Sequence, residues 1–195
     1  MISTALTLPV FLGRVRKVAL VICLLTTALS SLPHAQQLNT ESAATVKAAF
    51  LADIEVMREK FIGLAEAFPQ DTYTWRPMEG VRSVSEVLML IASEGYGFAP
   101  TALGGSAAMS REDSQGLADI TDKAQVIDHL NKGFDHARAE IEAIDPATLV
   151  SARALFGRER STPELALFVA GDMHEHLGQL IAYARTNQIV PPWSR

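Results

Sequence analysis

The sequence predicts an all-α fold, a four-helix bundle, on the basis of three observations. Four segments repeat apolar residues at spacings of three and four, which places those residues on one face of a helix. Residues that begin or end helices flank these segments. No segment shows the period-two alternation that is typical of a half-buried strand. Four helices with one apolar face each must bury those faces against one another, and a bundle does this.

The first two predicted helices are separated by a connection rich in turn residues. The first covers about residues 46–68 and ends at Pro69, and its apolar face consists of Val46, Phe50, Ile54, Met57, Phe61, Leu64 and Phe68. The second begins after Ser83, which with Glu86 matches a capping box, and it ends near Gly104. Residues 105–120 are small and polar, and a loop is predicted there.

The third and fourth predicted helices have clear ends. The third covers about residues 127–144 and stops at Asp145-Pro146, since the residue before a proline disfavours the helical conformation. The fourth begins at Thr162-Pro163, where proline suits the first helical position, and continues to about Arg185.

The N-terminal segment predicts export from the cytoplasm. Basic residues at Arg14, Arg16 and Lys17 precede the apolar run 18–32, and Ala35 suits a cleavage site. The run is shorter than the roughly 20 residues of a membrane span. We therefore expect a signal peptide at 1–35, a folded domain at 36–195, and a periplasmic or secreted protein that leaves the membrane after cleavage. An uncleaved N-terminal anchor is the alternative.

Charge and cysteine content exclude several classes of function. The chain has 17 basic and 22 acidic residues, and all the charged residues of the predicted signal peptide are basic. The remaining acidic domain disfavours nucleic acids and anionic membrane surfaces as partners. The single cysteine, Cys23, lies in the signal peptide, so the mature protein has no disulfide, cysteine ligand or cysteine nucleophile.

The stretch GDMHEHLGQL in the fourth helix is the most polar part of an apolar region. Asp172, His176 and Gln179 share one helical face, which Tyr183 continues, whereas His174 lies about 200° around the helix. An aspartate and a histidine four residues apart can hold a divalent metal if another helix adds a third ligand. A structural polar network and a solvated face are the alternatives.

Two segments, YTWRPMEGVRSVSEVLMLIAS and DMHEHLGQLIAYARTNQIVPPW, together resemble the DinB-like superfamily of bacterial proteins. The resemblance covers the layout of residues 40–195 and implies a four-helix bundle. It also implies a divalent metal bound by three histidines, an activity such as thiol-dependent transfer, and frequent dimers.

The resemblance also implies a degenerate set of metal ligands. Leu90 stands where the family has its first histidine, Asp172 where it has the second, and only His176 is kept. Leucine offers no lone pair, so the site needs a replacement ligand. Glu86 and Glu94 lie one turn before and after Leu90 on the same face, and either would give a carboxylate-rich site that favours harder ions than zinc.

Three hypotheses of function follow. The first is an exported bundle that binds a small molecule, with Leu90, Glu94, Gln179 and Tyr183 around the pocket, no catalytic residue and no cofactor. The second is a divalent-metal-dependent enzyme with Asp172 and His176 as ligands; export favours a hydrolase over a thiol transferase, because the usual low-molecular-weight thiols are cytoplasmic. The third is a homodimeric interaction module.

Overall fold

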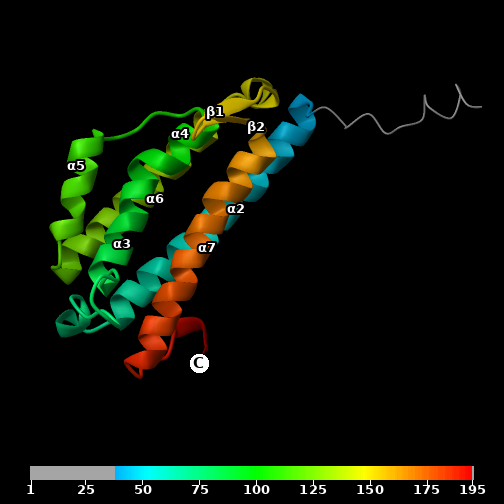
Figure 1. Cartoon of the computed structure of the whole chain (residues 1–195). Coiled ribbons are helices and arrows are strands. Elements are labelled where there is room, and N and C mark those ends of the chain that lie inside the picture. Colours follow the sequence, from blue (N-terminus) through cyan, green and yellow to red (C-terminus); the bar gives the residue numbers. More distant parts are fainter. Residues whose placement is uncertain (1–37, 195) are drawn as a thin grey trace, which may run out of the picture. The chain divides into compact units, whose positions relative to one another are not determined.

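The computed structural model describes residues 38–194, and the predicted signal peptide lies outside the described residues. The prediction of an all-α fold is confirmed (Figure 1). The α-helices are α2 (Thr40–Ala67), α3 (Val84–Ser93), α4 (Ala99–Leu103), α5 (Arg111–Gly116), α6 (Lys123–Ala143) and α7 (Thr162–Thr186). Short 3-10 turns lie at Gln70–Thr72, Leu117–Asp119, Pro146–Val150 and Pro192–Ser194.

One hydrophobic core joins the long helices. Helix α2 packs along both α6 and α7, and α3 packs on α6. Figure 1 shows α2 and α7 side by side. Most of the predicted apolar face of the first helix is buried in this core, namely Phe50, Ile54, Met57, Phe61, Leu64 and Phe68. The spacing of apolar residues therefore identified the buried face of α2 correctly.

Capping boxes fix the starts of three helices. The predicted box at Ser83 is present: Glu86 Oε2 accepts a hydrogen bond from the Ser83 N–H at 2.6 Å, and Ser83 Oγ accepts one from the Glu86 N–H at 3.3 Å. Asn39 and Ser42 form a similar box, so α2 begins several residues earlier than its apolar pattern predicted. The N-cap of α7 is Ser161 and not Thr162 as predicted, so Thr162 is the first helical residue and Pro163 the second.

The capping role of Glu86 gives a prediction for stability. The hydrogen bond from the Ser83 backbone is the main cause of a lowered pKa of Glu86, and the Arg76 guanidinium also lowers it. The folded state stabilises the ionised carboxylate of Glu86 more than the unfolded state does. This contribution to the free energy of unfolding is therefore present above pH 4.5 and is lost as the pH falls below it. Glu86→Ala should cost about 1 kcal/mol in the free energy of unfolding at pH 7, and less in acid.

Urea unfolding of Glu86→Ala at neutral pH and near pH 3.5 checks this prediction. Glu59→Ala is the matched control, because Glu59 is exposed in the middle of α2 and caps no helix. An equal loss of stability for Glu86→Ala at both pH values would show that the carboxylate charge is not the source.

The second predicted helix is interrupted. Helix α3 ends at Ser93, a π-helical turn follows at Glu94–Phe98, and α4 completes the segment. Gly95 of this turn contacts Gly133 of α6. A Cβ atom on Gly95 would lie 2.6 Å from the carbonyl carbon of Gly133, and one on Gly133 would lie 2.6 Å from the carbonyl oxygen of Ala92. The absence of side chains therefore lets the two backbones touch beside Glu94.

Two connections contain structure that the sequence analysis did not predict. Residues 105–120, predicted as a loop, include α5, which Ser110 caps by accepting a hydrogen bond from the Asp113 N–H. A hairpin joins α6 to α7, with β1 (Arg153–Leu155) antiparallel to β2 (Arg158–Arg160). Phe156 and Gly157 at its tip have φ of 50° and 72°, which suits a two-residue turn. Three-residue strands are too short to show a period of two.

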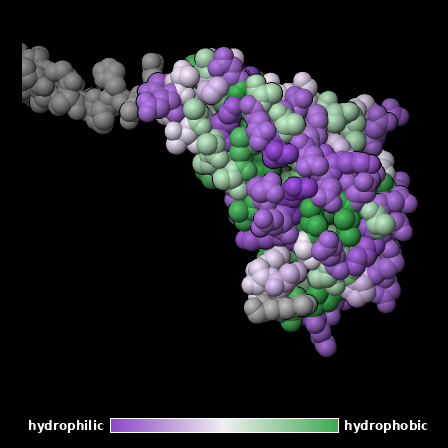
Figure 2. All heavy atoms as spheres, turned by 180° about the vertical axis from the view of Figure 1, so that it is seen from behind, coloured by the Kyte–Doolittle hydropathy of each residue, from purple (hydrophilic) through white to green (hydrophobic). Residues whose placement is uncertain are grey.

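The surface of the domain is mostly hydrophilic on the face that Figure 2 shows, and hydrophobic side chains lie between the hydrophilic ones. No helix between residues 38 and 194 is both long enough and apolar enough to span a bilayer.

Candidate metal centre

Three acidic and imidazole side chains from two helical segments meet inside the bundle. Glu94 lies where α3 passes into the π-helical turn, and Asp172 and His176 lie one turn apart on α7. Each of these three residues, together called the acidic group, offers one ligand atom, and these atoms all lie within 4.8 Å of one another. The spacing on α7 predicts the pair Asp172 and His176, and either Glu86 or Glu94 is the expected third ligand. The structure brings Glu94 to the pair, while Glu86 caps α3 and binds Arg76.

Glu94 is the buried member of the group, at 7% exposure. Its pKa is raised from 4.5 to about 9, mainly by burial and then by a hydrogen bond to Asp172 and the negative charge of Asp172, whereas the Arg82 guanidinium opposes the rise. Its Oε2 atom has no hydrogen-bond partner among the described residues. Without a cation, the Glu94 carboxyl group therefore holds a proton at neutral pH.

A chain of hydrogen bonds fixes the orientation of His176. The Tyr183 hydroxyl donates to the carbonyl oxygen of Arg82 at 3.0 Å, since a carbonyl can only accept. That hydroxyl accepts from Gln179 Nε2 at 2.7 Å, which leaves Gln179 Oε1 beside His176 Nδ1 at 2.9 Å. Nδ1 of His176 is then the donor. The neutral ring consequently has its lone pair on Nε2, which is free to bind a metal.

The donor set fits a divalent cation. Two carboxylates and one imidazole nitrogen suit ions that accept mixed oxygen and nitrogen ligands, such as Mn²⁺, Fe²⁺ or Zn²⁺. The convergence of the three ligand atoms supports the fit, and so does the buried Oε2 of Glu94, which has no hydrogen-bond partner among the described residues. A cation would replace the proton that Glu94 otherwise needs.

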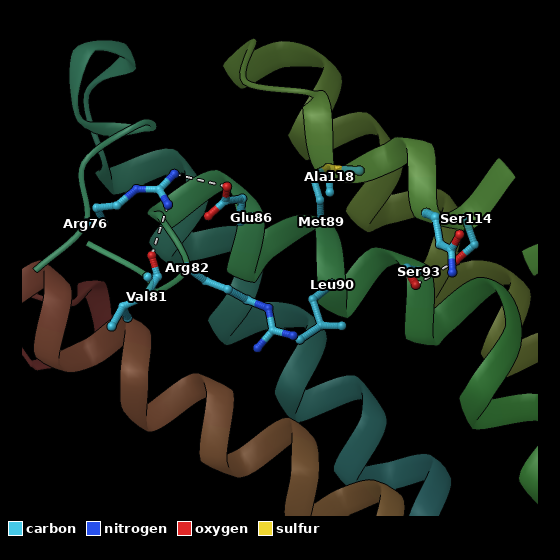
Figure 3. A pocket seen from close by; sticks show the side chains of 11 residues that line it. Arg76, Val81, Arg82, Glu86, Met89, Leu90, Ser93, Ser114 and Ala118 are labelled. Atoms are coloured by element: carbon cyan, nitrogen blue, oxygen red, sulfur yellow. Dashed lines mark hydrogen bonds and ion pairs between the residues drawn. The ribbon is translucent and has the colours of Figure 1, made fainter. Parts of the chain in front are cut away.

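A pocket of about 500 Å³ lies along α3 and the connection before it, and Figure 3 shows its lining, which does not include Glu94, Asp172 or His176. Leu90 of α3 and Arg82 of the preceding connection are part of this lining. Of the four residues predicted around a pocket, only Leu90 lines this one. Glu94 belongs to the acidic group, and Gln179 and Tyr183 form the hydrogen-bond chain behind His176.

Sequence reasoning missed Arg82. It lies in a turn-rich connection with no helical spacing, so nothing in the pattern of residues indicates that its backbone meets Tyr183 from 101 positions away. The other histidine of the polar stretch behaves as its spacing predicts. His174 faces α2, where its Nε2 lies 3.0 Å from Asp53 Oδ1.

Comparison with known proteins identifies the family. A family model described as the DinB superfamily matches residues 53–180, which is more than half of the chain. The chain belongs to the DinB superfamily. The match includes all three members of the acidic group, so the resemblance seen in the sequence is confirmed. No curated protein matches this DinB-superfamily chain.

Proposed function

We propose that this DinB-superfamily protein binds a divalent metal through Glu94, Asp172 and His176 and hydrolyses a small molecule. One observation carries the proposal: a buried glutamate without a partner for one oxygen converges with an aspartate and an oriented histidine within 4.8 Å. Of the three hypotheses drawn from the sequence, this favours the metal-dependent enzyme. The basic and apolar N-terminal segment supports action outside the cytoplasm, where hydrolysis needs no thiol cofactor.

Each residue of the proposed site would have a separate role. When bound, a divalent cation supplies Lewis acidity, which lowers the pKa of water and polarises a carbonyl oxygen. Glu94 closes the site against solvent on the α3 side, because it is buried. Gln179 keeps the Nδ1 proton of His176 in place, so that Nε2 stays available. Asp172 is half-buried and borders the more open side.

The test is metal content of the protein purified without a polyhistidine tag. Elemental analysis should find close to one equivalent of a divalent metal, and Asp172→Asn and His176→Ala should each lose it. His174→Ala is the matched control, because that histidine lies on α7 but contacts Asp53 instead. Absence of metal from the folded protein after incubation with Mn²⁺, Fe²⁺ and Zn²⁺ in turn would contradict the proposal.

The hydrogen bond behind His176 gives a prediction for affinity. Gln179→Ala removes the group that accepts the Nδ1 proton, and it leaves the three proposed ligands unchanged. Metal affinity should fall about 10- to 100-fold, as is usual when the partner of a ligating histidine is lost. Calorimetric titration with Mn²⁺ measures this, with the exposed Glu175→Ala as control. Unchanged affinity would mean that Gln179 does not position the ring.

The small-ligand-binding hypothesis keeps one observation in its favour, which is the pocket of about 500 Å³ that Leu90 helps to line. If the protein proves to bind no metal, this pocket is the remaining candidate for function, and binding without catalysis becomes the better reading.

A further inference from the structure

Two arginines line the pocket at α3, and only Arg76 has a hydrogen-bonded partner for its side chain among the described residues. Arg76 donates to Glu86 Oε1 at 3.0 Å and to the carbonyl oxygen of Val81 at 3.2 Å. Arg82 is exposed and takes part in no ion pair with the described residues. Figure 3 shows the Arg76 side chain bonded to Glu86 and the Arg82 side chain extended toward Leu90.

The backbone of Arg82 is held although its side chain has no partner. Its carbonyl oxygen accepts the hydrogen bond from Tyr183, and the next residue, Ser83, caps α3. The Cα atom from which the Arg82 side chain extends is therefore held between α3 and α7. The positive charge of this side chain also lowers the pKa of Glu94, against the larger effect of burial.

The rest of the lining contains both apolar and polar side chains, and Glu86 and Ser93 are the polar ones from α3. Met89, Leu90 and Ala118 contribute hydrocarbon surface, and a hydrogen bond of 2.8 Å between Ser93 Oγ and Ser114 Oγ closes one end. A volume of about 500 Å³ is within the range of pockets for small organic molecules. The chain as a whole has a net charge of −5, so an anion would find local attraction at this arginine rather than over the surface.

We propose that this pocket binds small molecules with one carboxylate and an apolar body, with Arg82 pairing with the carboxylate and Leu90 contacting the body. A single guanidinium without a partner balances a single negative charge, and its fork geometry matches a carboxylate. The proposal deepens the proposed function by naming its substrate class. It rests on that function only in placing the reacting group beside Glu94, one turn along α3 from Leu90.

The test compares 4-phenylbutyrate with its uncharged analogue 4-phenylbutanamide by calorimetry and by amide chemical shifts. The protein is treated with chelator first, so that the carboxylate cannot gain affinity from a metal. We expect the carboxylate to bind about tenfold more tightly than the amide. Arg82→Gln should remove this difference, while Arg111→Gln should keep it, because Arg111 is exposed on α5 and does not line the pocket.

Several results would overturn the proposal. These are equal affinity for the acid and the amide, no detectable binding of 4-phenylbutyrate at millimolar concentration, or an undiminished preference in a folded Arg82→Gln variant. Tighter binding of phenyl phosphate than of 4-phenylbutyrate would overturn the assignment to carboxylates. None of these measurements involves a metal, so a protein that binds the acid through Arg82 but contains no metal would contradict the proposed function alone.

Discussion

Glu94→Gln will make the metal-free protein more stable and will abolish metal binding. In the folded state the pKa of Glu94 is about 9, against an ordinary value of 4.5. Folding therefore takes up a proton between these two pH values, and the stability of the protein falls as the pH rises through this window. At pH 7 the protonation of Glu94 on folding lowers the free energy of unfolding by on the order of 3 kcal/mol. Glutamine has the same shape, has no charge to bury and can donate to Asp172.

We expect Glu94→Gln to gain about 1 to 3 kcal/mol at pH 7 in the presence of chelator, with no gain below pH 4.5. Urea unfolding across this pH range measures the difference, and Glu175→Gln on the exposed side of α7 is the control. A variant that is less stable than the wild-type protein at pH 7 would show that Glu94 has a structural role. A variant that still binds one equivalent of metal would remove Glu94 from the ligand set.

Gly133→Ala will strongly destabilise the fold and weaken the metal centre. A Cβ atom at this position would lie 2.6 Å from the Ala92 carbonyl oxygen, and a backbone atom cannot move aside as a flexible side chain can. Separating α6 from the end of α3 should cost about 3 kcal/mol, at the upper end of ordinary overpacking. It also displaces Glu94, which follows Ala92 by two residues. Metal affinity should therefore fall although no ligand is changed.

Gly171→Ala provides the matched comparison. It is also a glycine within a long helix, but a Cβ atom there would meet no heavy atom within 4 Å apart from its chain neighbours and the backbone of its own helix. Alanine should raise the free energy of unfolding by about 0.5 to 1 kcal/mol, because it has the higher helix propensity. Urea unfolding of both variants separates the two effects. Similar changes in stability at the two positions would show that the contact between α3 and α6 is looser than described.

The fold was predictable because helical periodicity and helix-ending residues are local signals. The apolar spacing through Phe50 and Phe61 identifies the buried face of α2, and the capping box at Ser83 identifies the start of α3. The π-helical turn was not predictable, because it depends on the contact of Gly95 with Gly133 in another helix. No single segment contains that information.

The candidate site was predictable in part for the same reason. Asp172 and His176 share a face of one helix, so their spacing reveals them, whereas the choice between Glu86 and Glu94 depends on which one faces α7. The role of Gln179 could not be predicted from the sequence either. It depends on the hydrogen bond that Tyr183 donates to the carbonyl oxygen of Arg82, a residue far away in the sequence.

The π-helical turn at Glu94–Phe98 has a consequence for insertions and deletions. A π-helical turn contains about one residue more than an α-helical turn. Deleting one residue between positions 95 and 98 would remove that extra residue, so the turn would close as an ordinary α-helical turn and α4 would keep its present face toward the bundle. Deleting one residue within α3 would instead rotate every following residue of the segment by about 100° about the helix axis. The segment therefore tolerates a change of length at the π-helical turn that it would not tolerate within α3.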